Sequence, residues 1–165
     1  EGGVYLDTDV ELIKPLDDLL ESNSCYIGVQ QDERLCNTGL GFGAVKASPV
    51  VLKMLSMYDG QVFAWERAGL LACPKSNDAV VRSYGFDGDG MGDVVRLKEV
   101  TIYPCRYFDP IAPGDHRNFL CDETVSMSLY ANSWGGAATR FKRVIIGVVG
   151  CERVDRLKRR FSRVE

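Results

Sequence analysis

The sequence predicts an α/β domain, and three observations support this fold class. Short apolar segments rich in β-branched and aromatic residues alternate with segments whose apolar residues recur at helical spacing. Glycine, proline, asparagine and aspartate stand between these segments, where turns are expected. The length of 165 residues and the composition, 45% apolar and 26% charged, are those of one globular domain with its own core.

The first part of the chain contains three segments with strand-like composition and one short helical segment. Residues 4–6 form an apolar run after two glycines, which predicts a buried strand. A short helix is expected over 16–20, after a proline, and a second strand over 25–29. Residues 39–45 alternate glycine with apolar side chains, which predicts a third strand with close backbone packing.

A longer helix is expected to begin at Ser48 and Pro49. Serine is a frequent N-cap residue, and proline is favoured at the first helical position because its fixed φ suits the helix. Apolar residues follow at helical spacing as far as Tyr58, and Asp59-Gly60 ends the run.

Three further elements are expected in the second half of the chain. A helix is predicted over 78–84, closed by Gly85, and a strand over 100–103, ended by Pro104. The apolar run 144–149 predicts one more element, and periodicity does not decide between strand and helix.

The charge distribution divides the chain into two parts of unequal size. The net charge is −3, but residues 140–165 contain nine basic and three acidic side chains, a net charge of +6. We expect residues 1–139 to form the domain core and 140–165 a basic C-terminal extension of the same domain. A solvated helical end explains such a tail, and so does peripheral contact with phosphates or anionic lipids.

The sequence also indicates the cellular setting. No basic segment followed by an apolar one opens the chain, and no apolar run is long enough to cross a bilayer. The six cysteines are scattered without a C-x-x-C pair, which favours reduced thiols over zinc ligands or a disulfide scaffold. We expect a cytoplasmic protein, at most peripheral to a membrane and without a nucleic-acid partner. Because the chain starts at Glu1 directly before an apolar strand, we also expect an upstream segment to be missing.

Asp7 and Asp9 follow the first predicted strand, at the end where open α/β sheets bind ligands. Residues i and i+2 of an extended segment point to the same face, so both carboxylates are expected to converge. Two hard oxygen ligands suit Mn²⁺ or Mg²⁺ bound together with substrate phosphates. Such an ion neutralises a departing nucleoside diphosphate. The pattern alone is weak, because a second D-x-D occurs at Asp87 and Asp89.

The same aspartates also fit the first motif of the haloacid dehalogenase-like phosphatases, in which Asp7 is the nucleophile and Asp9 the general acid. The stretch 88–93, GDGMGD, imitates the metal-binding motif of that family. Against this interpretation, Glu11 replaces the usual Thr or Val, and no convincing intervening Ser/Thr or Lys motif is found. The phosphatase is kept as an alternative.

A series of motifs follows in order between residues 1 and 134. They are GGVYLDTDVE at 2–11, PLDDLL at 15–20, NTG at 37–39, the segment that starts with SPV at 48–50, the helical segment 77–86, TIYP at 101–104 and SW at 133–134. This series closely resembles glycosyltransferase family 32, which includes fungal mannosyltransferases and bacterial capsule and lipopolysaccharide enzymes. An ordered series of motifs is far more specific than a single D-x-D.

The resemblance implies a GT-A type, Rossmann-like nucleotide-sugar transferase fold, incomplete at the N-terminus. It implies a retaining enzyme that moves a sugar from a UDP- or GDP-sugar to a hydroxyl of a glycan or lipid-linked acceptor, with Mn²⁺ or Mg²⁺ as cofactor. The implied metal ligands are Asp9, Asp7 and Asn132. The implied donor-binding residues are Asp7, Asn37, Ser133 and Trp134. No residue stands out as a catalytic base.

The sequence departs from the family pattern just ahead of Ser133-Trp134. Many members carry paired histidines there, whereas this chain has Ser128 and Leu129. The single histidine, His116, lies in a loop with proline and glycine and does not fill that position. An inactive relative that still binds sugar nucleotides is therefore a further alternative.

Overall fold

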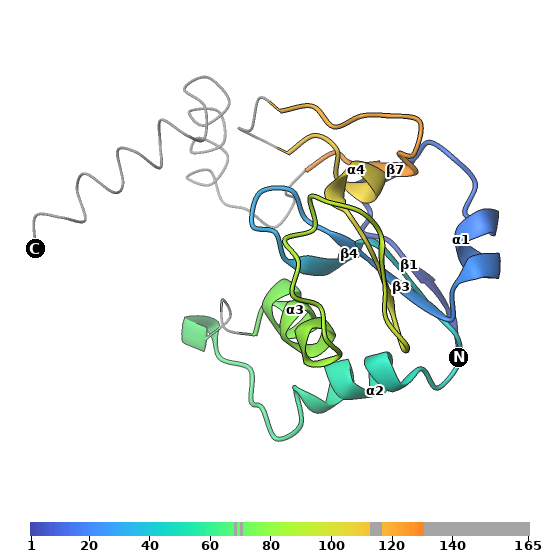
Figure 1. Cartoon of the computed structure of the whole chain (residues 1–165). Coiled ribbons are helices and arrows are strands. Elements are labelled where there is room, and N and C mark those ends of the chain that lie inside the picture. The colour runs from blue at the N-terminus through green and yellow to red at the C-terminus, as the bar shows by residue number, and fades with distance from the viewer. Residues whose placement is uncertain (68, 70, 113–116, 131–165) are drawn as a thin grey trace, which may run out of the picture.

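The computed structural model describes residues 1–67, 69, 71–112 and 117–130. These residues form a mixed α/β structure (Figure 1) with a five-stranded sheet, a separate two-stranded ribbon and helices on both faces of the larger sheet. In chain order the elements are β1 (Gly3–Tyr5), β2 (Val10–Leu12), α1 (Asp17–Ser22), β3 (Cys25–Val29), β4 (Cys36–Ala44), α2 (Pro49–Ser56), the 3-10 turn η1 (Trp65–Arg67), α3 (Cys73–Ser83), β5 (Val95–Arg96), β6 (Thr101–Tyr103), α4 (Cys105–Phe108) and β7 (Ser126–Ser128).

The sheet is mixed and has the strand order β1-β4-β3-β6-β5. Strands β1 and β3 both pair antiparallel with β4, and β3 pairs parallel with β6. Strands β1, β3 and β6 therefore run in the same direction, and their carboxyl ends lie at one edge of the sheet. The ribbon of β2 and β7 is antiparallel and joins segments that are more than a hundred residues apart in sequence.

Two hydrophobic clusters cover the two faces of this sheet. Helices α2 and α3 pack on one face through Val50, Met54, Val80 and Val81. Helices α1 and α4 contribute Leu19 and Phe108 to the cluster on the other face. Neighbouring residues of β3 point to opposite faces, since Ile27 belongs to the first cluster and Tyr26 to the second, as strand alternation requires.

The glycines of β3 and β4 make room for aromatic rings. A Cβ atom on Gly41 or on Gly28 would lie 2.8 Å from the ring of Phe108, which packs against the sheet at this point. Gly43 is covered in the same way by the ring of Tyr26, its partner in the neighbouring strand. The close backbone packing expected for the third strand is thus confirmed, and the strand begins earlier than predicted, at Cys36.

Several other expected elements are confirmed, although some of their first residues and capping contacts differ from the prediction. The predicted segments 16–20, 25–29, 49–58 and 100–103 correspond to α1, β3, α2 and β6. Helix α2 starts at Pro49 as expected, but the hydroxyl of Ser48 makes no capping hydrogen bond. Helix α3 starts at Cys73 and not at residue 78, because Pro74 occupies its first turn, where the missing N–H costs nothing.

The prediction that the first strand is buried is wrong. Strand β1 is exposed along its length, with Tyr5 55% accessible, because within the described part of the chain only β4 pairs with it. The predicted element at 144–149 and the basic extension 140–165 lie outside the described residues. Among the helices that are described, none has the length and apolar character needed to span a membrane.

Candidate functional site

The segment Asp7-Thr8-Asp9 leaves the carboxyl end of β1 and enters β2. The backbone N–H of Asp7 donates to the carbonyl of Gly39 at 2.8 Å, and the carbonyl of Asp7 accepts from the N–H of Val10 at 3.1 Å. Thr8 and Asp9 therefore stand in a turn. This corrects the premise that the two carboxylates share one face of an extended strand. Their positions are set by the turn and by its contacts with β4 and β7.

The carboxylate of Asp7 contacts two other groups on β1 and β4. The hydroxyl of Tyr5 donates to Oδ1 of Asp7 at 2.9 Å, and this bond, together with the negative charge of Asp7, raises the pKa of Tyr5. On its other side the carboxylate lies directly over Gly39. A Cβ atom on Gly39 would be 2.7 Å from Cγ of Asp7 and closer still to Oδ2, so only glycine leaves the space that this carboxylate occupies.

The first turn of α3 adjoins the same carboxylate. Although much of Cys73 is exposed, its thiol is partly enclosed, which raises its pKa, and the negative charge of Asp7 raises that pKa further. A hydrogen bond with Thr38 acts in the opposite direction. The side-chain amide of Asn77 in turn donates to the hydroxyl of Thr38 at 3.0 Å. Sequence reasoning missed Cys73; the only signal was Cys73-Pro74 as a helix start.

Asn37, predicted as a donor-binding residue, lies at the start of β4, beside the Asp7 contact. Its Oδ1 accepts from the N–H of Gly39 at 2.9 Å, and its Nδ2 donates to Oε1 of Gln30 at 3.2 Å. The side chain is half-buried and bridges the ends of β3 and β4. The structure therefore brings Asn37 to Asp7 through Gly39, the residue that both of them contact.

Strand β7 lies beside the turn that carries Asp9. Val10 is in register with Ser128, and the N–H of Leu129 donates to the carbonyl of Asp9 at 2.7 Å. The two positions at which many family 32 members have histidines, Ser128 and Leu129, thus adjoin the D-x-D turn through the backbone. Asp9 itself is half-buried.

A buried carboxylate that the sequence analysis missed lies at the same edge of the sheet. Asp109 follows α4 directly after β6 and is completely inaccessible to solvent. Its Oδ2 accepts from the N–H of Gln31, after β3, at 2.8 Å. The hydroxyl of Tyr130, after β7, lies 2.8 Å from Oδ1 and 2.7 Å from Oδ2. Burial raises the pKa of Asp109 to about 6.

The second D-x-D lies in the loop between α3 and β5, which adjoins the carboxyl end of β3. Asp89 pairs with Arg34 at 3.2 Å and accepts from the N–H of Met91 at 3.0 Å. Its loop packs on Val29, at the end of β3, two strands away from β1. These contacts are those of a surface turn.

Three of the predicted site residues, Asn132, Ser133 and Trp134, lie outside the described residues, as does His116. In the described part of the chain, no group of three or more histidine, cysteine, aspartate or glutamate side chains is gathered in a way that would hold a metal ion alone. Asp7 and Asp9 remain suited to an ion that takes most of its other ligands from phosphate and water, because the carboxyl groups are hard oxygen donors.

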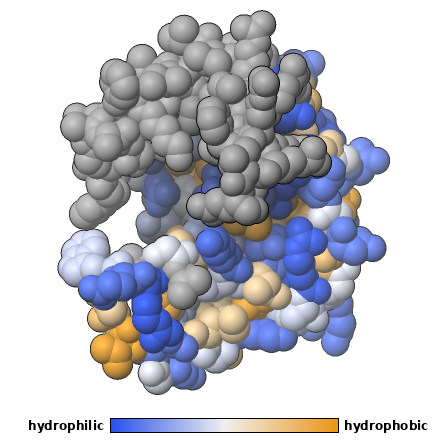
Figure 2. All heavy atoms as spheres, turned by 90° about the vertical axis from the view of Figure 1, so that its left-hand side faces the viewer, coloured by the Kyte–Doolittle hydropathy of each residue, from blue (hydrophilic) through white to orange (hydrophobic). Residues whose placement is uncertain are grey.

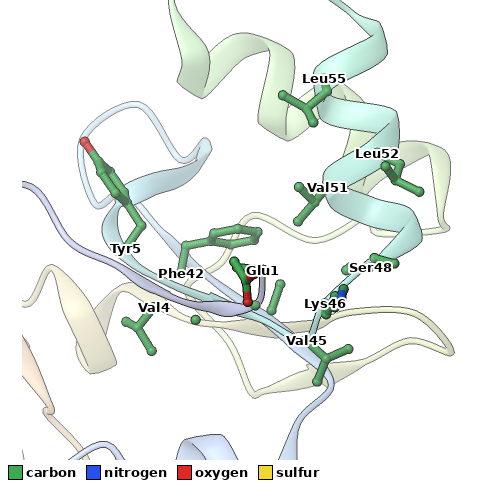
Figure 3. A pocket seen from close by; sticks show the side chains of 14 residues that line it. Glu1, Val4, Tyr5, Phe42, Val45, Lys46, Ser48, Val51, Leu52 and Leu55 are labelled. Carbon is green, nitrogen blue, oxygen red and sulfur yellow. The ribbon is translucent and has the colours of Figure 1, made fainter.

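A separate cavity of about 540 Å³ lies between β1, β4 and α2 (Figure 3). Its walls are mainly apolar and include Val4, Phe42, Val51, Leu52 and Leu55. The cavity shares only Tyr5 with the site described above, since neither Asp7, Asp9 nor Asn37 lines it. Few polar groups converge in it, in contrast to the ends of the strands.

The loop between α2 and α3 exposes a second set of apolar side chains. Phe63 and Trp65 stack edge to face with ring centroids 5.2 Å apart, and Trp65 is 83% accessible. Figure 2 shows the molecule from the side on which this loop lies in Figure 1, and apolar groups stand there among charged ones.

Comparisons of this chain with protein-family models, with curated proteins and with solved structures give no match. The resemblance to glycosyltransferase family 32 therefore depends on the ordered motifs of the sequence, and the fold that the structure supports is a mixed α/β sheet domain.

Proposed function

We propose that this chain contains the donor-binding half of a metal-dependent, retaining glycosyltransferase with a GT-A type fold. One observation carries the proposal: the carboxyl ends of the parallel strands β1, β3 and β6 are linked to one another by the residues of the candidate site. Asp7 and Asp9 follow β1, Asn37 bridges to the end of β3, and Asp109 follows β6. This is the edge at which open α/β sheets bind nucleotides.

The proposed roles are those that the resemblance to glycosyltransferase family 32 implies. Asp9 is the principal ligand of Mn²⁺ or Mg²⁺, and Asp7 binds the ribose or sugar and supports the ion. The bound ion supplies charge neutralisation for the diphosphate that leaves. Tyr5 and Gly39 orient the carboxylate of Asp7 from two sides, which reduces the reorganisation required when the donor binds. Asn37 faces the donor sugar.

The proposed residues Asn132, Ser133 and Trp134 come shortly after Leu129 in the sequence. Leu129 is bound to the carbonyl of Asp9, and the described chain ends one residue later at Tyr130. Asn132 as a third ligand and Ser133 and Trp134 as contacts of the diphosphate are proposed from the resemblance alone.

The proposed reaction transfers the glycosyl group from the diphosphate oxygen to an acceptor hydroxyl with retention of configuration. The bond between the anomeric carbon and the phosphate oxygen breaks, and a new bond forms to the acceptor oxygen on the same face of the sugar. The acceptor proton passes to the departing phosphate. The protein contributes mainly positioning and electrostatic stabilisation, which explains why no side chain is needed as a base.

The test is a titration of the full-length protein with UDP and GDP, with and without Mn²⁺. In Asp9→Ala we expect the metal-dependent affinity to fall at least about tenfold, equivalent to about 1.4 kcal/mol. Asp87→Ala is the matched control, because it removes an aspartate from the second D-x-D, and its affinity should equal that of the unmodified protein. Equal metal-dependent affinity in the Asp9→Ala variant would refute the site.

The same preparation distinguishes the alternatives. Hydrolysis of a sugar nucleotide by the full-length protein would exclude an inactive binding relative. Phosphatase activity that depends on Asp7, without any nucleotide affinity, would favour the dehalogenase-like enzyme. The contacts of Asp89 with Arg34 and Met91 speak against that enzyme. Its second motif requires this aspartate as a metal ligand, whereas here the side chain is engaged in a surface turn.

A further inference from the structure

We propose that Thr38 is a positioning residue of the donor site. Helix α3 binds the hydroxyl of Thr38 and thereby fixes residues 38–41 of β4, the segment that contacts both the backbone and the carboxylate of Asp7. This inference deepens the proposed function and rests on it for the role of Asp7. The contacts between α3 and β4 are themselves features of the described structure.

Residues 38–41 depart from the regular pairing of the sheet. Along β3 the register passes from Ile27 to Gly28, whereas along β4 it passes from Phe42 to Asn37. In the described sheet, the residues between these two positions of β4 are therefore not in register with any residue of β3. Such extra residues in one strand form a β-bulge, and bulges are frequent beside active sites, where they redirect side chains.

The directions of the side chains show the same irregularity. Leu40 packs in the cluster that contains Phe108, and a Cβ atom on its neighbour Gly41 would meet the ring of Phe108 as well. Two consecutive residues of β4 thus face one side of the sheet. In a regular strand, neighbouring residues face opposite sides. The segment is therefore out of phase with the rest of β4.

The backbone of this segment is bound by neighbouring groups instead of by β3. The N–H of Gly39 donates to Oδ1 of Asn37 at 2.9 Å, and the carbonyl of Gly39 accepts from the N–H of Asp7 at 2.8 Å. The carbonyl of Leu40 accepts from the hydroxyl of Ser126, a fully buried residue of β7, at 3.3 Å. The position of the segment therefore depends on single bonds from other elements.

Helix α3 binds the segment through Thr38. Asn77 is buried, and its side-chain amide donates to the hydroxyl of Thr38 at 3.0 Å. A further hydrogen bond joins this hydroxyl to the thiol of Cys73, one helical turn earlier on the same face of α3. Asp78, also buried, accepts from the N–H of Cys36 at 3.2 Å. Buried polar side chains are costly unless they are bonded, so these bonds hold α3 to the start of β4.

The tolerance for movement at this point is small. Helix α3 and strand β7 both pack against β4 and lie on opposite sides of it (Figure 1). Thr38 directly precedes Gly39, and a Cβ atom on Gly39 would lie 2.7 Å from Cγ of Asp7. A displacement of Thr38 would therefore move Gly39 and change the space that the carboxylate of Asp7 occupies.

The first experiment measures the Mn²⁺-dependent affinity of the full-length protein for UDP and GDP in Thr38→Val and Thr38→Ser. Valine keeps the shape of threonine and removes the hydroxyl, so we expect affinity to fall roughly five- to tenfold, a range of about 1–1.4 kcal/mol. Serine keeps the hydroxyl and should restore the affinity to within about twofold of that of the unmodified protein. A loss in Thr38→Ser equal to that in Thr38→Val would overturn the role of the hydroxyl.

Asn77→Ala tests the same bond from the other side. We expect a similar loss of affinity, and no further loss when Thr38→Val is added, because the two substitutions remove one shared bond. Asn23→Ala is the control. It removes amide bonds to the hydroxyl of Tyr103 at 3.0 Å and to the carbonyl of Leu19 at 2.8 Å. Asn23 precedes β3, whose other end adjoins the site, so its removal should lower stability and leave affinity unchanged.

The second experiment needs no nucleotide. Amide hydrogen exchange, followed by NMR, reports on the N–H groups of Asp7 and Gly39, which are bonded to and within the bulged segment. In Thr38→Val we expect both amides to exchange at least about fivefold faster than in the unmodified protein. The amide of Ala44, in the regular part of β4, should be unaffected, and Thr38→Ser should restore the slow exchange.

The outcomes separate this inference from the proposed function. Unchanged exchange of Asp7 and Gly39 in Thr38→Val overturns the positioning role, whatever the nucleotide data show. If exchange responds but the unmodified protein binds neither UDP nor GDP with Mn²⁺, the proposed function fails and the anchoring of β4 by Thr38 stands. An equal loss of affinity in Asn23→Ala would indicate a general effect of lowered stability and would also overturn the role of Thr38.

Discussion

At the scale of single residues, the orientation of the Asp7 carboxylate depends on the neighbouring side chains. Tyr5 donates to one of its oxygens, and the absence of a side chain on Gly39 leaves room for the other. Cys73, at the start of α3, lies near the same carboxylate, and its thiol is hydrogen-bonded to Thr38 of β4. Tyr5 and Gly39 thereby limit the orientation of a carboxylate that is otherwise exposed to solvent. A metal ion or a ribose hydroxyl would bind the carboxylate in that orientation.

Gly39→Ala tests this arrangement. The added Cβ atom would lie too close to the carboxyl group of Asp7, so the carboxylate must move while the backbone of β4 stays in place. We expect Mn²⁺-dependent nucleotide affinity to fall at least about tenfold, with a loss of unfolding free energy below ~1 kcal/mol. Titration calorimetry and chemical denaturation measure the two effects. Gly92→Ala is the control, because nothing lies within 4 Å of the position, and equal affinities in both variants would contradict the prediction.

At the scale of elements, the glycines of β4 serve two purposes. Gly39 adjoins the candidate site, whereas Gly41 supports the ring of Phe108, which packs in the cluster under α1 and α4. The rings of Tyr26 and Phe108 are stacked with centroids 6.0 Å apart. A displacement of the Phe108 ring would therefore also displace the ring of Tyr26. The same strand therefore has, two residues apart, one glycine beside the candidate site and one glycine that leaves room for a ring of the core.

Gly41→Ala should affect stability more than binding. The new Cβ atom would lie 2.8 Å from the ring of Phe108 in a closely packed core, and overpacking of this kind costs about 1–3 kcal/mol. We expect a matching decrease in unfolding free energy measured by urea denaturation. Nucleotide affinity of the folded fraction should change less than twofold or so. The reverse pattern, with full stability and lost binding, would show that Gly41 belongs to the site.

At the scale of the whole molecule, the described chain has one open apolar side. Strand β1 has an unpaired edge among the described residues, and exposed apolar side chains stand around the adjoining cavity (Figure 3). These side chains are Val4, Tyr5, Val45, Leu52 and Leu55. An edge strand beside an apolar surface is a common site of association between chains.

We therefore expect the 165-residue chain, prepared alone, to self-associate. Sedimentation velocity at concentrations from about 1 to 100 μM should show a concentration-dependent increase in mass. Replacing Leu52 and Leu55 with lysine should reduce association. Leu20→Lys on α1 is the control, because this leucine is exposed to a similar degree, 50% against 57% and 61%, and does not line the cavity. A monomer over the whole range of concentrations would contradict the expectation.

Local patterns in the sequence determined a large part of the fold and one end of the site. The β-branched run at 25–29, the Ser48-Pro49 helix start and the strand ended by Pro104 each depend on neighbours a few residues away, so they are readable without a structure. The position of Asp7 and Asp9 after the first strand was predicted for the same reason. The glycines of β4 also signalled a close approach, although not what approaches.

Contacts between distant segments decided the rest. The first strand looks buried from its composition, and it is exposed because the strand order puts β1 at the edge of the described sheet. Asp109 and Gln31 are 78 residues apart, and Tyr130 meets Asp109 only when β7 pairs with β2. A one-dimensional pattern carries no signal for such pairs, because their distance is set by strand pairing and core packing. The sequence by itself determined which residue types stand at the strand end, and the tertiary structure decided which side chains surround Asp7 and that Asp109 meets Gln31 and Tyr130.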